Sequence, residues 1–393
     1  MKKIVFYISF LTILFITSSC IEEFNAATTE FEDVIVIEAS LNDQLTFQKV
    51  LLSRTYKIDE SQNQQVKESG ANVRIVSNAT TYTFSETSSG TYTSDIQFRA
   101  EINTDYQLLI TTQSGREYQS EVTQLRSETS NIENIYAVRE VNDDGVEGIS
   151  IYLDSYDPSG NSRYYTFDFQ ETYQIVAPFW KSEEVVVINK SPFQIIVRDR
   201  TEEARFCYST NISNGRLVTN TNLSDEDRVS RFLIRFIPND DIRVNSRYSI
   251  LVKQYVNTEQ AYSFQETTNE LSSLGSLFSP VQPGFVAGNI VSANNSNEKV
   301  IGFFEVSAVR EQRIFVNRID LIDELYNNWG GEECRAIELE EIPEPGFREL
   351  LIQDRILGFL FDPPSPFPVQ VVYKPCGDCR VWGSNIKPDF WID

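Results

Sequence analysis

The run Val34-Ile35-Val36-Ile37-Glu38-Ala39 begins the part of the chain that decides the fold, because its β-branched side chains and its length are those of a β-strand. Similar runs recur roughly every ten residues, with glycine-containing turn signals between them. In one of them, polar and aromatic side chains alternate, as expected for a sheet with one face in water. These further runs are Phe47–Leu52, Val73–Val76, Thr81–Phe84 and Tyr106–Thr112. Together they predict a small antiparallel β-sandwich over residues 34–126.

A polar break at Ser127–Ser130 separates this region from a second one, in which the strand-like runs are longer. They include Ile132–Val141, Gly148–Tyr156, Tyr164–Ile175, Ser249–Val256 and Val300–Val309. We therefore expect a larger antiparallel β domain over residues 131–393, and a fold that is mainly β.

One stretch near 257–278 has a helical period. Asn257 and Gln260 have the spacing of a capping box, and the side chains of one stripe then follow three or four residues apart. The stripe consists of Ala261, Phe264, Thr268, Leu271, Leu274 and Phe278. It predicts an amphipathic helix that packs on a sheet.

The composition excludes several classes of protein. The chain of 393 residues carries 57 acidic and 34 basic side chains, a net charge of −23, whereas a nucleic-acid-binding protein presents a basic face to phosphate. It contains no histidine, which excludes Ser-His-Asp and Cys-His catalysis, histidine-ligated zinc and haem on a proximal histidine. The sequence motifs of phosphate-binding loops, nucleophile elbows and dinucleotide-binding sites are absent. We expect no enzyme activity, no cofactor and no metal.

Carboxylates leave one enzymatic alternative open. Two acidic side chains could serve a surface hydrolase, but among 57 acidic residues no spacing singles out a pair. The segments 142–145 and 154–161 are the most similar to calcium-binding loops. They lack the alternating oxygen ligands and the closing glutamate, so we interpret both as β-turns.

The first twenty residues have the features of a bacterial lipoprotein signal. Lys2 and Lys3 precede an apolar run, 4–16, that is too short to cross a bilayer, and small residues at 17–19 lead directly to Cys20. We predict that residues 1–19 are a cleaved signal peptide, that Cys20 is lipidated and that residues 20–33 form a polar tether. The alternative is an ordinary secretory signal with a coincidental cysteine.

Cleavage at Cys20 would remove two lysines and no acidic residue, which changes the net charge from −23 to −25. Attachment to a membrane would then rest on acyl chains rather than on basic side chains. The acidic pair Glu22-Glu23 resembles the surface-export signal of Bacteroidota lipoproteins. We expect an outer-membrane location, anchored by lipid and exposed at the cell surface, with the periplasmic face as the alternative.

Four cysteines remain after Cys20, an even number that predicts two disulfides in an exported protein. They are Cys207, Cys334, Cys376 and Cys379, which allow three pairings. Zinc binding or redox chemistry at the C-x-x-C pair is the weaker interpretation, because an oxidising compartment opposes free thiolates and no helical pattern follows the motif. A bridge within C-x-x-C would close a very small loop, so we expect both of its cysteines to pair with Cys207 and Cys334.

The last residues include two large aromatic side chains, Phe390 and Trp391. A chain end rarely carries such rings unless they dock on something. We predict that the disulfides hold the tail against the second domain and that Phe390 and Trp391 anchor it there. The alternative is a partner-facing tail, because exposed aromatic side chains mark interfaces.

Several short motifs contain glycine. They are Gly70–Val73 with Gly90–Tyr92, Gly288–Ile290, Gly302–Phe304, and a tail motif of Pro375–Arg380, Gly383 and Lys387–Trp391. Together they resemble a lipoprotein family catalogued as domain of unknown function 4249, whose members look like Bacteroidota outer-membrane lipoproteins encoded beside TonB-dependent receptors. The resemblance implies an accessory role in nutrient uptake, without enzyme activity. The N-terminal motifs also resemble transthyretin-like and carboxypeptidase-regulatory β-sandwiches.

We therefore expect a lipid-anchored outer-membrane accessory protein that binds a TonB-dependent receptor and assists nutrient capture or uptake. Its expected interactions are with that receptor and, through lipid, with the membrane, and nucleic acid is not among them. A surface hydrolase that uses a carboxylate pair and a structural envelope lipoprotein are the alternatives.

Overall fold

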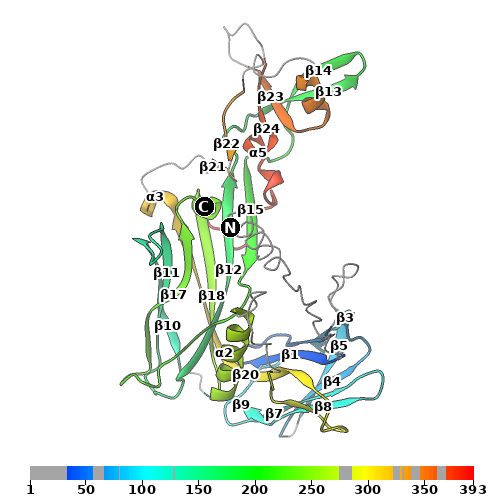
Figure 1. Ribbon diagram of the computed structural model, residues 1–393, viewed down its shortest axis with the longest axis vertical. Coiled ribbons are helices and arrows are strands. Elements are labelled where there is room, and N and C mark those ends of the chain that lie inside the picture. Colours follow the sequence, from blue (N-terminus) through cyan, green and yellow to red (C-terminus); the bar gives the residue numbers. More distant parts are fainter. Residues whose placement is uncertain are drawn as a thin grey trace, which may run out of the picture.

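The computed structural model describes residues 33–55, 66–78, 80–126, 129–273, 286–321, 328–329, 332–337, 346–360 and 369–393. The predicted signal peptide, Cys20 and all but the last residue of the predicted tether lie outside these ranges, as do Leu274 and Phe278 of the predicted helix. The described chain is mainly β, as the sequence predicts, and its sheets pack on one another (Figure 1).

The predicted N-terminal strands form an antiparallel sheet at the lower right of Figure 1. They are β1 (Ile35–Asn42), β2 (Lys49–Arg54), β3 (Val66–Lys67), β4 (Asn72–Ser77), β5 (Thr81–Ser88), β6 (Thr91–Ser94), β7 (Asp105–Thr111), β8 (Glu117–Ser120) and β9 (Thr123–Gln124). The order is β1-β2-β6-β5-β4-β7-β8, with β3 beside β2 and β9 beside β7. In β5, Phe84 is buried while Thr81 and Thr83 are exposed, so the alternation of the sequence marks the two faces of the sheet.

Two sheets of longer strands face each other in the second region. One contains β10 (Asn131–Val141), β11 (Glu147–Tyr156) and β17 (Arg228–Pro238), and the other contains β12 (Tyr164–Val176), β15 (Phe206–Ile212), β16 (Leu217–Asn220), β18 (Arg247–Val256) and β20 (Val300–Asn317). The rings of Phe167 on β12 and Phe232 on β17 pack between them, with centroids 5.0 Å apart. Buried side chains of both sheets share one hydrophobic core with the N-terminal sheet, in a sandwich-like arrangement.

Strand β20 joins the N-terminal sheet to the second region. Its residues 300–307 pair in parallel with β1, and its residues 308–317 pair antiparallel with β18. At the change of partner, the Val309 amide and the Arg310 guanidinium both donate hydrogen bonds to the Asp43 carboxylate, at 2.8 and 2.6 Å. A short strand, β19 (Ile290–Ser292), pairs with β8. Residues 290–307 therefore belong to the N-terminal sheet although they come late in the chain.

The upper part of Figure 1 is a smaller lobe with its own apolar cluster. It contains the hairpins β13 (Glu183–Lys190) with β14 (Phe193–Asp199), β21 (Asn328–Trp329) with β22 (Glu332–Glu333) and β23 (Ile356–Leu360) with β24 (Val369–Tyr373), together with α4 (Gly346–Ile352), α5 (Lys374–Gly377) and the 3-10 turn η3 (Cys379–Val381). Leu351 of α4, Ile356 of β23 and Val371 of β24 form its buried centre, against which Val185, Val187 and Phe193 pack. The helical period of the sequence predicts neither α4 nor α5, because both are shorter than two full turns.

The predicted amphipathic helix is present as α2 (Glu259–Ser273), and two shorter elements, η1 (Ile242–Val244) and α3 (Arg318–Leu321), complete the fold. The predicted cap at Asn257 is wrong by one residue. The Thr258 hydroxyl accepts the hydrogen bond of the Ala261 amide at 3.1 Å, whereas Asn257 is buried and donates to the Thr166 hydroxyl of β12. The polar side chain at 257 thus serves the packing of the helix on the sheet, and the next residue takes the capping role.

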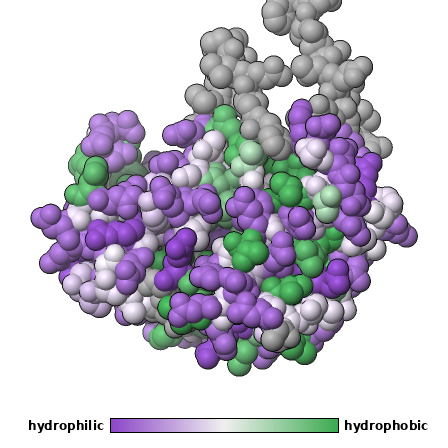
Figure 2. All heavy atoms as spheres, turned by 90° about the horizontal axis from the view of Figure 1, so that it is seen from below, coloured by the Kyte–Doolittle hydropathy of each residue, from purple (hydrophilic) through white to green (hydrophobic). Residues whose placement is uncertain are grey.

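Among the described residues, none of the helices combines the length and the apolar composition needed to cross a membrane. Seen from below, the surface carries small hydrophobic groups of residues with hydrophilic residues between them (Figure 2). Exposed apolar side chains that are separated by hydrophilic ones are common on protein surfaces.

Candidate functional site

Two of the motifs singled out in the sequence meet in space at Gly288 and Gly302. A Cβ atom at Gly288 would lie 1.6 Å from the Gly302 carbonyl oxygen, and one at Gly302, whose φ is +144°, would lie 2.0 Å from the Ile37 carbonyl oxygen. Beside them, the Asn289 side chain accepts from the Phe304 amide at 2.8 Å and donates to the Phe304 carbonyl at 2.9 Å. The two glycines therefore allow the chain before β19 to lie directly on β20, and β20 to lie directly on β1.

This close packing turns the side chain of Phe303 toward helix α2. The ring of Phe303 lies 5.2 Å from the ring of Phe264 on α2, measured between centroids, at an angle of 33°. A hollow lies on each side of this aromatic pair. We call them the Gly288 pocket, with a volume of about 460 Å³, and the Arg216 pocket, with a volume of about 500 Å³.

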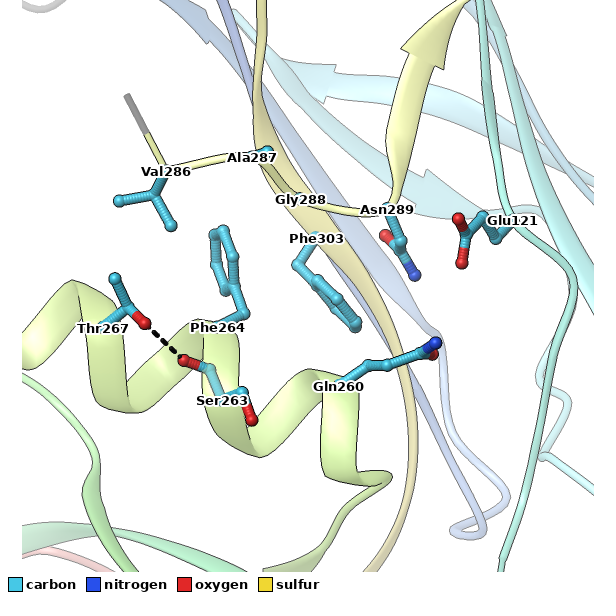
Figure 3. A pocket seen from close by; sticks show the side chains of 10 residues that line it. All are labelled: Glu121, Gln260, Ser263, Phe264, Thr267, Val286, Ala287, Gly288, Asn289 and Phe303. Carbon is cyan, nitrogen blue, oxygen red and sulfur yellow. Dashed lines mark hydrogen bonds between the residues drawn. The ribbon is translucent and has the colours of Figure 1, made fainter. Parts of the chain in front are cut away.

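The Gly288 pocket is lined by polar and apolar groups, of which one is a carboxylate, from separate parts of the chain (Figure 3). Helix α2 contributes Gln260, Ser263, Phe264 and Thr267, the segment 286–289 and Phe303 form another wall, and Glu121 lies at one end near Gln260. The Thr267 hydroxyl donates its one hydrogen to the Ser263 carbonyl at 2.8 Å. The sequence marks α2 as a packing helix, and no motif distinguishes its polar face as part of a pocket.

The Arg216 pocket lies over β1, β2 and β20 and contains a closed charge network. Arg216 pairs with Glu305 at 2.7 Å and with Asp168 at 3.9 Å, and its guanidinium lies 4.1 Å from the ring centroid of Tyr255. Burial alone would lower the pKa of Arg216, but Glu305, Tyr255 and Asp168 outweigh it and raise that pKa. Arg216 is thus held as a cation by neighbouring groups. Glu305 is 89 residues away from Arg216 in the sequence, so local spacing could not reveal this pair.

The second calcium-loop-like segment contains a buried carboxylate, Asp157, that is satisfied by hydrogen bonds. Its oxygens accept from the Ser162 and Thr129 hydroxyls at 2.6 Å each and from the Ser159 amide at 2.8 Å. Burial raises the pKa of Asp157, but these hydrogen bonds more than offset it and lower the pKa. The Gly160 amide donates to the Asp157 carbonyl at 3.2 Å, in agreement with the predicted turn.

The neighbouring Asp227 is also buried and bonded on all sides. It accepts from the amides of Ser162 and Arg163 and from the hydroxyls of Tyr165 and Thr221. Such fully bonded, water-excluded carboxylates stabilise the loops around them. Within the described ranges, no group of three or more Asp, Glu or Cys side chains is arranged to hold a metal ion.

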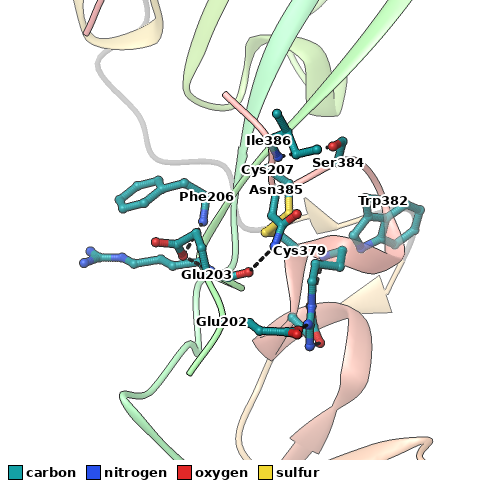
Figure 4. The surroundings of a disulfide bond; sticks show 12 residues. Glu202, Glu203, Phe206, Cys207, Cys379, Trp382, Ser384, Asn385 and Ile386 are labelled. Atoms are coloured by element: carbon teal, nitrogen blue, oxygen red, sulfur yellow. Dashed lines mark hydrogen bonds and ion pairs between the residues drawn. A yellow bond between two sulfur atoms is a disulfide. The ribbon is translucent and has the colours of Figure 1, made fainter. Parts of the chain in front are cut away.

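The four predicted disulfide cysteines form two bridges, Cys207–Cys379 and Cys334–Cys376. Both bridges leave the C-x-x-C pair and reach other parts of the chain, as expected, and the structure selects this pairing from the three. The four side chains are buried in one cluster with Ile175 and Val372. Beside the first bridge, the Asn385 side chain donates to the Glu203 carbonyl at 3.0 Å (Figure 4).

The C-terminal aromatic residues lie against the second region. Trp391 is 4% exposed, and its ring meets the rings of Tyr208 and Phe315 edge-on, with centroids 5.0 and 5.5 Å apart. Phe390 is 36% exposed, and the Arg313 guanidinium lies 3.7 Å from its centroid. Trp391 is therefore packed as a core residue, while Phe390 contributes to the surface. Trp391 packs on Phe315 near the C-terminal end of β20, whereas Gly302 lies near the N-terminal end of that strand.

Comparison with known proteins gives one informative match. None of the curated proteins compared with the chain matches it. The family model described as Domain of unknown function (DUF4249) matches residues 21–313, which include the motifs at Gly70, Gly90, Gly288 and Gly302 and exclude the tail. The match covers most of the chain and ends within β20, the strand that joins the two regions. The chain therefore belongs to the DUF4249 family.

Proposed function

We propose that this protein is a lipid-anchored outer-membrane accessory protein that binds a TonB-dependent receptor and assists nutrient capture or uptake. The signal-like N-terminus with Cys20 supports the anchor. The motifs that meet at Gly288 and Gly302 are among those that resemble lipoproteins encoded beside such receptors, and they support the receptor as partner.

The composition of the Gly288 pocket is the observation that carries a binding role. Among the described residues that line it, Glu121 is the one with a formal charge. Hydrolysis of a glycosidic bond by a carboxylate pair needs two such groups about 5–9.5 Å apart around the substrate. The carboxylates beyond the aromatic pair, Glu305 and Asp168, are engaged by Arg216 and Tyr255. The pocket therefore favours binding of a ligand over its hydrolysis.

The lipid anchor is tested by Cys20→Ala. We expect this variant to lose fatty-acid labelling and to leave the membrane fraction or retain its signal peptide. Ser19→Ala is the matched control, because it keeps a small residue before the cysteine and should be lipidated normally. Unchanged labelling and membrane partition of Cys20→Ala would contradict the anchor. Digestion of the protein on intact cells by an added protease would support surface exposure, and protection until lysis would place it on the periplasmic side.

The receptor is tested by purification of the tagged protein from solubilised outer membrane. We expect a TonB-dependent barrel to co-purify in stoichiometric amount. Recovery of unrelated abundant proteins alone would remove the main support for the proposal. Hydrolysis of a carbohydrate or peptide substrate in a broad activity screen would instead support a surface hydrolase.

Deletion of the gene separates transport from a structural role. An uptake protein should be needed for growth on one nutrient, with the envelope otherwise intact. A general weakening of the envelope, with equal growth on all nutrients, would favour a structural lipoprotein.

A further inference from the structure

We infer that the Gly288 pocket binds an uncharged, hydroxyl-rich ligand with an apolar face, which is the chemistry of a carbohydrate, and that it rejects anions. This inference rests on the proposed role in nutrient capture and assigns a class of cargo to it. The volume of about 460 Å³ lies within the range of small-molecule sites, roughly 300–1,000 Å³.

The apolar part of the site is the aromatic pair. Phe264 and Phe303 are half-buried and come from different elements, α2 and β20, that are each held by the core. Figure 3 shows both rings between Val286 at one end and Gln260 at the other. Aromatic faces of this kind bind the C–H face of a sugar ring, because that face is apolar while the hydroxyl groups point outward.

The polar part of the site consists of side chains whose hydrogen-bonding groups can still bind a ligand. In the described part of the chain, no protein group bonds the side chains of Gln260, Ser263 or Glu121. An amide, a hydroxyl and a carboxylate together donate and accept hydrogen bonds, as a ligand with several hydroxyl groups requires. The Asn289 side chain, by contrast, makes one donor and one acceptor hydrogen bond with the Phe304 backbone, which fix its orientation in the wall of the pocket.

The charges of the residues around the pocket favour a neutral ligand over an anionic one. No lysine or arginine is among the described residues that line the pocket, and Glu121 would repel a carboxylate or phosphate. Arg216 lies beyond the aromatic pair and is neutralised by Glu305. The net charge of −23 adds a repulsive field for anions over the whole molecule.

The inference is tested by ligand-observed NMR on the full chain purified in detergent. The probes are the neutral disaccharides maltose and cellobiose, and the anions glucuronate and glucose 6-phosphate. We expect the neutral probes to bind and the anions not to bind at millimolar concentration. Phe303→Ala and Gln260→Ala should each lower the affinity for the neutral probes by about tenfold, because the first removes an aromatic contact and the second a hydrogen-bonding group.

Gln265→Ala is the matched control, because Gln265 lies on the same helix but lines the Arg216 pocket. It should bind the neutral probes as the unchanged protein does, and circular dichroism should show the same fold for all variants. Absence of binding by both neutral probes, equal or tighter binding of the anions, or unchanged affinity in Phe303→Ala and Gln260→Ala would each overturn the inference. Co-purification of the receptor is measured separately, so the proposed function can fail while sugar binding persists, and the reverse.

Discussion

Removal of the Cys207–Cys379 bridge should destabilise the protein more than removal of the Cys334–Cys376 bridge. The first spans 172 residues and the second 42, so the chain-entropy relation assigns them about 5 and about 4 kcal/mol of constraint on the unfolded chain. Both pairs of sulfurs are buried, so the packing lost on replacement by alanine is similar. The difference between the two double variants, Cys207→Ala/Cys379→Ala and Cys334→Ala/Cys376→Ala, is therefore set by loop length.

Urea unfolding followed by tryptophan fluorescence measures this difference. The four tryptophans lie at 180, 329, 382 and 391, all in the second region, which contains both bridges. Hydrogen exchange shows which part of the chain loses stability. Loss of the long bridge should expose the amides of residues 379–393 and leave those of the N-terminal sheet protected. Equal losses of unfolding free energy for the two double variants, or an unchanged value for the variant without the long bridge, would refute the reasoning.

Three further outcomes are expected. Trp391→Ala should cost about 3–5 kcal/mol because it empties a buried site, while Phe390→Ala should cost clearly less, and thermal unfolding that ranks them otherwise would contradict the packing of the tail. Gly288→Ala should destabilise by about 3 kcal/mol or prevent folding, since its Cβ would overlap the backbone of β20, whereas Gly215→Ala should change the unfolding free energy by less than about 1 kcal/mol. The lowered pKa of Asp157 means that its stabilising effect is present above about pH 4 and is lost as the pH falls toward its folded value. Asp157→Asn should therefore show a smaller loss of stability on acidification, and an identical acid profile would show that this carboxylate is not involved.

Much of the local structure could be predicted from the sequence. Alternation in Thr81–Phe84 corresponds to β5, and the stripe beginning at Ala261 corresponds to α2, because strand and helix periods are set by which side chains of neighbouring residues face the core. The cap of α2 was displaced by one residue because Asn257 is drawn into the packing on β12, which local spacing does not report.

The candidate site was only partly visible in the sequence. Its glycines stood out in the motifs, but Gln260, Phe264 and Glu121 carry no local signal of a pocket. They become neighbours when α2, the segment before β19 and the end of β8 are brought together by the sheet.

The sequence by itself determined that this is a mainly β chain with one amphipathic helix and two disulfides, since composition, period and cysteine number are properties of the chain alone. Only the tertiary structure decided which cysteines pair and that β20 lies parallel to β1. It also decided that the long strand β20 belongs to the sheets of both regions. The physical reason is that these contacts join residues up to about 265 positions apart. At such separations the entropy of closing the loop depends only weakly on its length, so it does not favour one distant partner over another. The partner is then selected by the surfaces that fit and become buried together, and those surfaces exist only once the sheets have formed.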